Sequence, residues 1–189
     1  MTYTPINNKL FENKYFISRI PYEEAIKIAI EKHYMHRKMP CSKAYGLIYN
    51  NEIKGICTYG VPVSSTLLKG VCGIEEYFNI YELNRLWVDE DVPKNGESFL
   101  IGNSIKDLDR EIIISFSDTS VGHIGYIYQA TNFLYCGLSS KFKDIRVKGK
   151  ENQHTATFAH GLTFKEVEQK YGKENTYYVE RPRKHRYVY

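Results

Sequence analysis

The segment that most constrains the fold is 111–117 (EIIISFS), in which apolar residues follow one another without polar alternation. Such a run predicts a strand buried on both faces, because a strand with one wet face would alternate apolar and polar residues. Its aliphatic part, Ile112 to Ile114, is far too short to cross a bilayer. The chain therefore needs structure on both sides of a sheet, as in α/β proteins.

The segments around this strand predict the rest of a mixed sheet. Apolar spacing predicts helices over 22–34, about 97–108 and about 123–134. Strand patterns cover 14–20, 44–50, 52–60 and 82–89. The second and third of these strands meet at Asn50-Asn51 as a hairpin, and strands alternate with basic loops after the last helix. We expect an α/β fold with a mixed, mostly antiparallel sheet and helices on both faces.

Length and composition indicate one soluble domain. The 189 residues match one ordinary domain, so we expect a single domain over 1–189. The apolar share of 42% and the charged share of 25% are those of a globular protein. The four cysteines form no CxxC pair, and the polar N-terminus lacks a secretory apolar stretch. We therefore expect a cytoplasmic protein with reduced thiols and no membrane partner.

Positive charge is concentrated in two short segments. The net charge of the chain is +4, whereas 141–150 carries five basic residues against one acid and 180–189 carries four against one. Basic clusters interleaved with aromatic residues suit a polyanion, because cations meet phosphates and rings stack on bases. A solvated basic surface is the alternative. The cations that we expect on DNA phosphates are Lys148, Lys150, Arg181, Arg183, Lys184 and Arg186.

The C-terminal segment has two interpretations. Pro182 disfavours a regular helix there, and Tyr187 and Tyr189 would offer stacking faces next to the cations. Alternatively, residues 186–189 pair with the sheet as an edge strand, and the charges are only solvated.

Three blocks of residues carry a resemblance to a known family. They are His33-Tyr34-Met35-His36-Arg37, then Asn84-Arg85-Leu86-Trp87-Val88-Asp89 with Lys94-Asn95-Gly96-Glu97-Ser98, then 117–132 (SDTSVGHIGYIYQATN). This set, in this order, resembles the Mom family of bacteriophage DNA-modification proteins over about residues 30–137. The resemblance implies a GNAT-like acyltransferase fold and attachment of a carbamoylmethyl group to the N6 amine of adenine in double-stranded DNA. Such a modification shields phage DNA, in the host cytoplasm, from restriction enzymes.

The third block contains an acid and a phenol that could converge on one cleft. Asp118 directly follows the buried strand, at the sheet edge where α/β proteins place ligands. Tyr128 lies ten residues later, in the helix that packs over the same strand end. The resemblance implies that Asp118 takes a proton from the attacking amine and that Tyr128 protonates the leaving group. The structural alternative is that Asp118 caps the helix and Tyr128 is packing.

The second block supplies candidates for substrate and donor binding. Asn84 and Arg85 lie on the strand that, in this fold, is splayed from its neighbour to form the cofactor cleft. Adjacent strand residues point to opposite faces, and we expect Arg85 to bind a phosphate or carboxylate. A surface ion pair of Arg85 with Glu82 or Asp89 is the alternative. Ser98, Ser120 and His123, from the same blocks, complete the candidates.

The first block places two histidines three residues apart at a helix end. His33 and His36 could face one side, and an HxxH pair can bind iron or zinc, although two ligands are not a site. A core position for His33 and a C-terminal cap for His36 form the structural alternative. Because His33 and Tyr34 belong to the Mom-like block, we expect them in the catalytic cleft rather than on a metal.

The donor is the weakest part of the family interpretation. The segment 91–97 (DVPKNGE) has one glycine where GNAT enzymes hold the pyrophosphate of acetyl-CoA with a Q/R-x-x-G-x-G/A loop, and Pro93 lacks a backbone N–H. In addition, acetyl transfer leaves a carbonyl on N6, whereas a carbamoylmethyl group has a methylene there. A glycyl donor would supply the right atoms and is the alternative to acetyl-CoA.

Two other functions remain open from the sequence. One is a GNAT N-acetyltransferase that acts on a small-molecule or protein amine, which tight acetyl-CoA binding without DNA binding would favour. The other is a non-catalytic nucleic-acid-binding protein. The sequence also leaves open whether the chain acts as a monomer or a homodimer.

Overall fold

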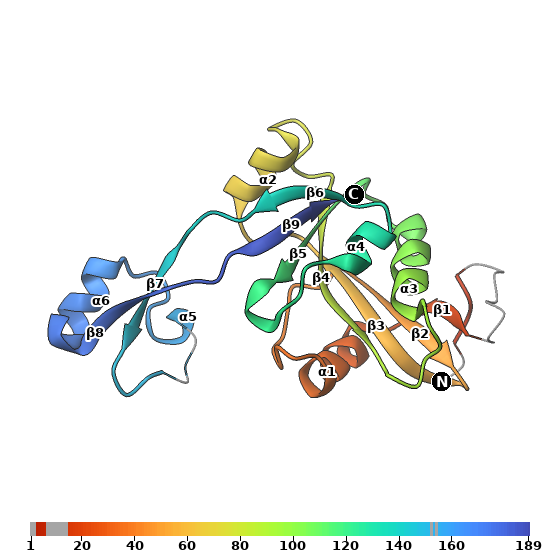
Figure 1. The fold of residues 1–189 in the computed structure, drawn as a ribbon, viewed down its shortest axis with the longest axis horizontal. Coiled ribbons are helices and arrows are strands. Elements are labelled where there is room, and N and C mark those ends of the chain that lie inside the picture. Colours follow the sequence, from red (N-terminus) through yellow and green to blue (C-terminus); the bar gives the residue numbers. More distant parts are fainter. Residues whose placement is uncertain (1–2, 7–14, 152, 154) are drawn as a thin grey trace. The chain divides into compact units, whose positions relative to one another are not determined.

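The chain folds into two compact units. The computed structural model describes residues 3–6, 15–151, 153 and 155–189 (Figure 1). The first unit comprises 1–117, 124–137 and 185–189, and the second comprises 118–123 and 138–184. No helix in the described residues is both long enough and apolar enough to cross a membrane. The expectation that 1–189 form a single domain stays a prediction.

A seven-stranded sheet organises the first unit. Its strands, in spatial order, are β1 (Phe16–Arg19), β2 (Lys43–Tyr49), β3 (Glu52–Gly60), β4 (Ile80–Val88), β5 (Ile112–Asp118), β9 (Lys184–Val188) and β6 (Leu134–Leu138). The pairs from β1 to β4 are antiparallel, whereas β4 and β5 are parallel. Ile113 and Tyr189 exchange both backbone hydrogen bonds, which joins the C-terminus to β5. The predicted mixed, mostly antiparallel sheet is confirmed.

The predicted hairpin joins β2 and β3. Its two turn residues, Asn50 and Asn51, have φ of 51° and 62°. Positive φ at both central positions is the geometry of a two-residue turn whose twist matches that of the strands, and Asn tolerates it better than most residues.

Helices cover both faces of the sheet. They are α1 (Tyr22–Lys32), α2 (Ser65–Cys72), α3 (Gly96–Ser104), continued by the 3₁₀ turn η1 (Ile105–Asp107), and α4 (Tyr126–Ala130). α1 and α3 lie on opposite sides of β2 and β3 (Figure 1). In β5, Ile113 joins the core beneath α3, and Ile114 joins a second core with Leu68 of α2. Both isoleucines are fully buried, which confirms the strand with two covered faces.

A bulge in β4 separates it from β5. Thr58 of β3 pairs with Arg85 and the next residue, Tyr59, pairs with Leu83, so Asn84 has no partner in the ladder. The parallel pairing with β5 ends at Leu83 and Ser115. The bulge re-aims the side chains that follow it, as bulges next to functional sites do. β4 therefore opens away from β5 from residue 84 onward.

The second unit is built on a two-stranded ribbon. β7 (Lys143–Val147) pairs antiparallel with β8 (Thr176–Glu180). Around the ribbon lie α5 (Thr155–Phe158), α6 (Phe164–Tyr171) and η3 (Lys173–Asn175), and the unit also contains the 3₁₀ turn η2 (Thr119–Val121). Its small core consists of Ile145, Val147, Phe158 and Val167. Thr163 and Glu166 form a capping box at the start of α6.

The structure corrects one predicted element and adds three helices. The helix expected over 123–134 is only the five residues of α4, because Gly125 enters it at φ 78° and Asn132 leaves it at φ 67°. A Cβ at Gly125 would collide with the ring of Tyr187. Helices α2, α5 and α6 were not expected, since each is short and buries few residues. Residue 14 of the strand expected over 14–20 lies outside the described residues.

Candidate active site

Two buried ionisable groups of the first unit, Tyr128 and Arg85, belong to the region where the pairing of β4 with β5 ends at Leu83 and Ser115. Tyr128 of α4 is 9% exposed, and its ring lies 5.5 Å from Phe133 and 5.2 Å from Tyr187, centroid to centroid. Burial, with smaller contributions from Tyr34 and Glu82, raises the pKa of Tyr128 to about 12, against the opposing effect of the Ser115 hydroxyl. Tyr128 is therefore a protonated phenol at neutral pH, as a general acid must be.

Arg85 is a buried cation with an unused donor. Its side chain is 8% exposed; Nη1 donates to the Asn84 carbonyl at 2.6 Å and Nη2 to the Arg37 carbonyl at 3.4 Å. In the described part of the chain its Nε–H has no hydrogen-bond partner. Burial lowers the pKa of Arg85, Arg37 lowers it further, and Tyr34 and Glu82 oppose the shift. A buried guanidinium with a free N–H is suited to bind an anion.

Tyr128 and Arg85 thus share two electrostatic neighbours, Tyr34 and Glu82. From the sequence, Glu82 is a candidate only as an ion-pair partner of Arg85, and nothing in the sequence points to the influence of Arg37 on Arg85 or of Ser115 on Tyr128. Glu82 and Arg85 are three residues apart, so in a regular strand they would face opposite sides. The bulge at Asn84 reverses this, and no signal in the sequence marks the bulge.

The Asn84 side chain stabilises the bulge in β4 through two hydrogen bonds. Its Oδ1 accepts a hydrogen bond from the Thr58 hydroxyl at 2.7 Å, and its Nδ2 donates to the Pro40 carbonyl at 2.6 Å. In this structure the amide positions the backbone that carries Arg85. A role for Asn84 in donor binding stays a prediction.

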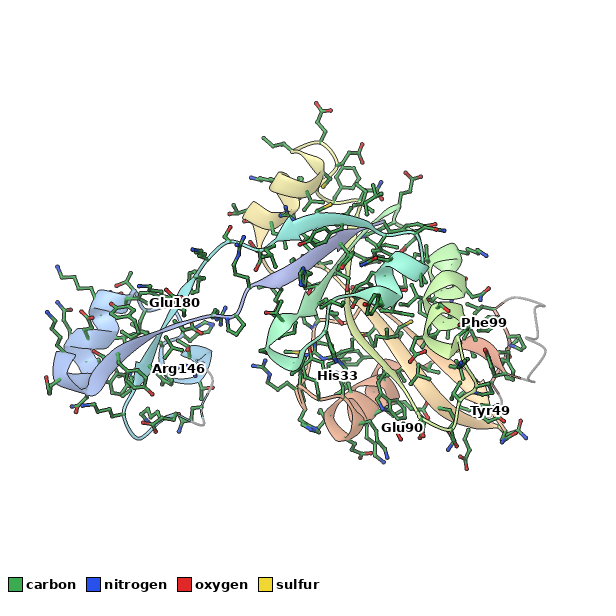
Figure 2. All side chains as sticks on the ribbon, viewed as in Figure 1. His33, Tyr49, Glu90, Phe99, Arg146 and Glu180 are labelled. Atoms are coloured by element: carbon green, nitrogen blue, oxygen red, sulfur yellow. The ribbon has the colours of Figure 1, made fainter. Side chains whose placement is uncertain are left out.

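The end of α1 brings His33 and Tyr34 together. His33 follows α1, is 6% exposed, and accepts the Met35 N–H at its Nδ1 at 3.1 Å (Figure 2). The Tyr34 ring lies against it, with centroids 4.4 Å apart, and remains 44% exposed. Tyr34 influences the pKa of both Arg85 and Tyr128. The catalytic roles of His33 and Tyr34 stay predictions.

The structure does not support the iron candidate. Nδ1 of His36 lies 2.8 Å from the Ile30 carbonyl. His36 therefore caps the C-terminus of α1, which is the alternative to metal binding that the sequence left open. Among the residues that the structure describes, no group of three or more His, Cys, Asp and Glu side chains could hold a metal ion.

In the second unit, Asp118 caps a turn. Its Oδ1 accepts the Ser120 backbone N–H at 2.9 Å and the Ser120 hydroxyl at 2.6 Å, and Lys184 Nζ lies 3.3 Å from Oδ2. Burial acts to raise the pKa of Asp118, but Ser120 and Lys184 together outweigh it and leave the pKa below its ordinary value. The His123 N–H donates to the Asp118 carbonyl at 3.2 Å.

Asp118 therefore caps the turn, as one interpretation of the sequence proposed. It is also an ionised carboxylate, as a general base must be. Asp118 belongs to the second unit and Tyr128 to the first. Their convergence on one cleft, and the binding roles of Ser120 and His123, stay predictions.

The loop before α3 does not fit the pyrophosphate of CoA. The Asp91 and Val92 N–H groups both donate to Asp89, at 3.4 Å and 3.1 Å, and Pro93 has no N–H to offer. A Cβ at Gly96 would lie 2.6 Å from Val92, so this glycine serves packing within the loop. Ser98 donates its hydroxyl to the Asn95 carbonyl at 3.1 Å. Glu97 in the first turn adds a negative charge where an anion would sit.

The candidate DNA-binding cations differ in their surroundings. Lys148 is exposed, and Arg181 Nε lies 2.7 Å from the buried Asp144 carboxylate. Lys150 lies above the Tyr171 ring, with Nζ 6.0 Å from its centroid. Arg183 donates to the Ser139 carbonyl at 2.6 Å. Lys184 is the ion-pair partner of Asp118 described above.

The C-terminal segment is a strand of the sheet rather than a free basic tail. β9 lies between β5 and β6, so it is also not the edge strand of the alternative interpretation. Arg186 donates to the Cys136 carbonyl at 3.0 Å. Tyr187 is 1% exposed and cannot stack on a base, whereas Tyr189 is 46% exposed. Binding of DNA by these residues stays a prediction.

Comparison of the sequence with known proteins gives a family match. The model of the Mom protein family matches residues 14–189. A curated relative, "Methylcarbamoylase mom" of Escherichia phage Mu, is 30% identical over 112 residues, which are 56% of this chain and 46% of the phage protein. The match thus spans about half the length of that relative.

Comparison with solved structures gives the fold. A putative acetyltransferase from Acinetobacter baylyi has a TM-score of 0.51 at 11% identity, covering 97% of this chain and 94% of that chain. A GNAT family acetyltransferase from Bacillus cereus has a TM-score of 0.50 at 11% identity, covering 93% and 96%. An N-acetyltransferase from Staphylococcus aureus has 0.50 at 14%, covering 93% and 97%. The predicted GNAT-like fold is confirmed.

Proposed function

Because this chain belongs to the Mom protein family, we propose that it is a transferase that modifies the N6 amine of adenine in DNA by carbamoylmethylation. The modification protects phage DNA from host restriction enzymes, in the cytoplasm of the host cell. The name of the phage Mu relative, methylcarbamoylase, supports this reaction. The observation that carries the proposal is the pair of buried groups, protonated Tyr128 and Arg85, in the region where the pairing of β4 with β5 ends.

The target adenine must leave the duplex stack to reach such groups. The Tyr34 ring follows α1, is partly exposed and packs against the His33 ring. An aromatic ring of this kind can stack on a flipped base whatever its hydrogen-bonding edge. Tyr34 is therefore the residue that we assign to hold the base.

The proton steps follow from the ionisation states of two residues. N6 attacks the carbonyl carbon of an activated acyl donor, and Asp118, ionised at neutral pH, takes the proton that N6 releases. As the bond between that carbon and the leaving group breaks, Tyr128 gives its hydroxyl proton to the leaving group. Arg85 binds the anionic part of the donor through its free Nε–H.

Atom balance and the loop before α3 both support a glycyl donor. That loop does not fit CoA, so we assign no step to acetyl-CoA. A glycyl donor would acylate N6, after which the glycyl amine attacks ring C6 and the C6–N6 bond breaks. The former N6 becomes the amide nitrogen of the carbamoylmethyl group, and no oxidant or reductant is consumed.

Mass spectrometry of nucleosides tests both parts of the proposal. DNA from cells that express the chain should contain carbamoylmethyl-adenine, and DNA from cells that express Tyr128→Phe should contain far less. Labelled glycine should transfer its label to the modified base, and labelled acetate should not. Absence of modified adenine would overturn the function, whereas label from acetate alone would overturn only the glycyl donor.

A further inference from the structure

The positive charge of the protein is concentrated in one segment of the second unit. Residues 138–184 contain 11 Lys and Arg against 6 Asp and Glu, whereas the whole chain has a net charge of +4. The rest of the chain is therefore close to neutral. This segment contains the ribbon β7–β8 and the helices that pack on it.

The two faces of the ribbon differ. Pairing of Ile145 with Tyr178 places both on the face that α6 covers, where Ile145 is buried and the Tyr178 hydroxyl donates to Glu168 at 2.9 Å. Alternation along the strands places the Arg146–Tyr177 pair on the opposite face, which we call the open face. Arg146 of β7 is labelled in Figure 2.

The open face combines apolar and cationic side chains. Tyr177 and Val179 of β8 are 37% and 41% exposed. Lys148 extends the face beyond β7, because its N–H continues the ladder by donating to the Asn175 carbonyl at 2.9 Å. At the C-terminal end of β8, Arg181 follows the strand. The open face therefore combines two largely apolar side chains, Tyr177 and Val179, with three cations, which are Arg146, Lys148 and Arg181.

A buried carboxylate holds two of these cations in place. Asp144 is 5% exposed, and its Oδ2 lies 2.7 Å from Arg181 Nε and 4.0 Å from Arg146 Nη2. Arg146 also donates to the Gln153 carbonyl at 3.1 Å. Fixed guanidinium groups lose less side-chain entropy when they bind an anion, so this arrangement suits a repeated array of phosphates.

We propose that the open face of the β7–β8 ribbon, formed by Arg146, Lys148, Tyr177, Val179 and Arg181, docks in the major groove of double-stranded DNA. The groove is about 12 Å wide and admits a two-stranded ribbon, whose strands are about 4.8 Å apart. The cations bind the phosphates, and Tyr177 and Val179 contact the base edges. This inference rests on the proposed function only in its choice of DNA as the polyanion.

Two double variants of the full chain with equal charge change test the assignment. The ribbon variant is Arg146→Gln with Lys148→Gln, which leaves Asp144 paired with Arg181. The control variant is Lys165→Gln with Lys173→Gln, two exposed cations of the same unit in α6 and η3. Binding to a short unmodified duplex is measured by fluorescence anisotropy over a range of salt concentrations.

The ribbon variant should bind about tenfold more weakly at physiological salt, and its slope of log K against log salt should fall by about 1.8, at about 0.9 per lost phosphate contact. The control variant should keep the slope of the original protein. An unchanged slope in the ribbon variant, or an equal loss in the control, would overturn the assignment. The second result would mean that only net charge matters.

A second measurement tests whether the ribbon binds in the major groove. A duplex whose cytosines carry a bulky sugar on C5 has an obstructed major groove and should bind more weakly than the plain duplex. A minor-groove ligand should not compete. Equal binding of the two duplexes, or competition by the minor-groove ligand, would overturn the groove placement.

These results are separable from a failure of the proposed function. If the original protein binds DNA through the ribbon but no modified adenine forms in cells, the function fails and the ribbon assignment stands. If modified adenine forms and the ribbon variant binds like the original protein, only the ribbon assignment fails.

Discussion

In the first unit two groups that we assign to the chemistry, Tyr128 and Arg85, lie beneath the surface, whereas in the second unit the groups that we assign to DNA binding lie on it. Tyr128 and Arg85 are less than one-tenth exposed and have displaced pKa values, upward for the phenol and downward for the guanidinium. Lys148 and Tyr177 are exposed around a small core. Proton transfer gains from groups withdrawn from water, because electrostatic effects are stronger there, whereas recognition of a polyanion needs cations at the surface.

The two units also differ in what holds them together. The main core of the first unit gathers fourteen buried residues from the sheet, α3 and α4, whereas the core of the second gathers four. The stability of the second unit therefore depends more on local hydrogen bonds, such as those of the Thr163–Glu166 capping box. Substitutions in each unit can test this difference between buried groups that act in the chemistry and exposed groups that bind DNA.

The largest expected effect comes from Asp118→Asn. Asn keeps the size of the side chain and the oxygen that caps η2, so folding should be nearly intact. Modification should fall about 10²–10⁴-fold, the range for lost general acid–base catalysis. Nucleoside mass spectrometry after incubation with duplex DNA measures it.

The matched control for that change is Asp109→Asn, which removes another ion-paired carboxylate, 3.1 Å from Lys43. It should leave modification unchanged. If Asp118→Asn also left it unchanged, Asp118 would be only a cap and the chemistry would be confined to the first unit.

A smaller effect, visible in stability against pH, is expected for Tyr128→Phe. The folded-state pKa of Tyr128 is raised to about 12, so its stabilising contribution is complete below the unfolded pKa of about 10 and is lost as the pH rises towards 12. The original protein should lose up to about 3 kcal/mol over this interval that the variant does not lose. Below pH 10 the two should differ by about 1 kcal/mol.

Urea unfolding of both proteins from pH 8 to pH 12 measures this difference. Activity at pH 8 should be lost in the variant although its melting temperature changes little. A loss of activity and of melting temperature together would mean that Tyr128 packs the core without acting in the chemistry. A difference in stability between the two proteins that stays constant from pH 8 to pH 12 would mean that the phenol is accessible to water.

The smallest effect is expected for Thr163→Ala in the second unit. Removal of the cap at α6 should cost about 1 kcal/mol. Because the core of this unit is small, amide hydrogen exchange should accelerate in α6 and β8 and stay unchanged in β2 and β3 of the first unit. Equal acceleration in both units would show that they unfold together.

The sequence predicted best the elements whose pattern is local and complete. The strand at 111–117 and the hairpin at Asn50-Asn51 appear where expected, because one depends on an uninterrupted apolar run and the other on residues that tolerate positive φ. The short helices α2, α5 and α6 escaped prediction, since a helix of about two turns or fewer shows too few repeats of its period. The helix after Asp118 was overestimated for a different reason, because positive φ at Gly125 and Asn132 limits α4 to five residues.

By itself, the sequence determined the mixed α/β sheet, the residues of the Mom-like blocks and the concentration of cations in the C-terminal third. Only the tertiary structure decided which of them share surroundings. The bulge at Asn84 turns Arg85 to the side of Glu82, and the insertion of β9 into the sheet buries Tyr187. The tertiary structure also decided that Arg146 lies on the open face of the β7–β8 ribbon, whereas Arg186 donates a hydrogen bond to the Cys136 carbonyl within the larger sheet. The physical reason is that strand register and burial depend on partners distant in the chain, whereas period, charge and turn preference are properties of neighbouring residues.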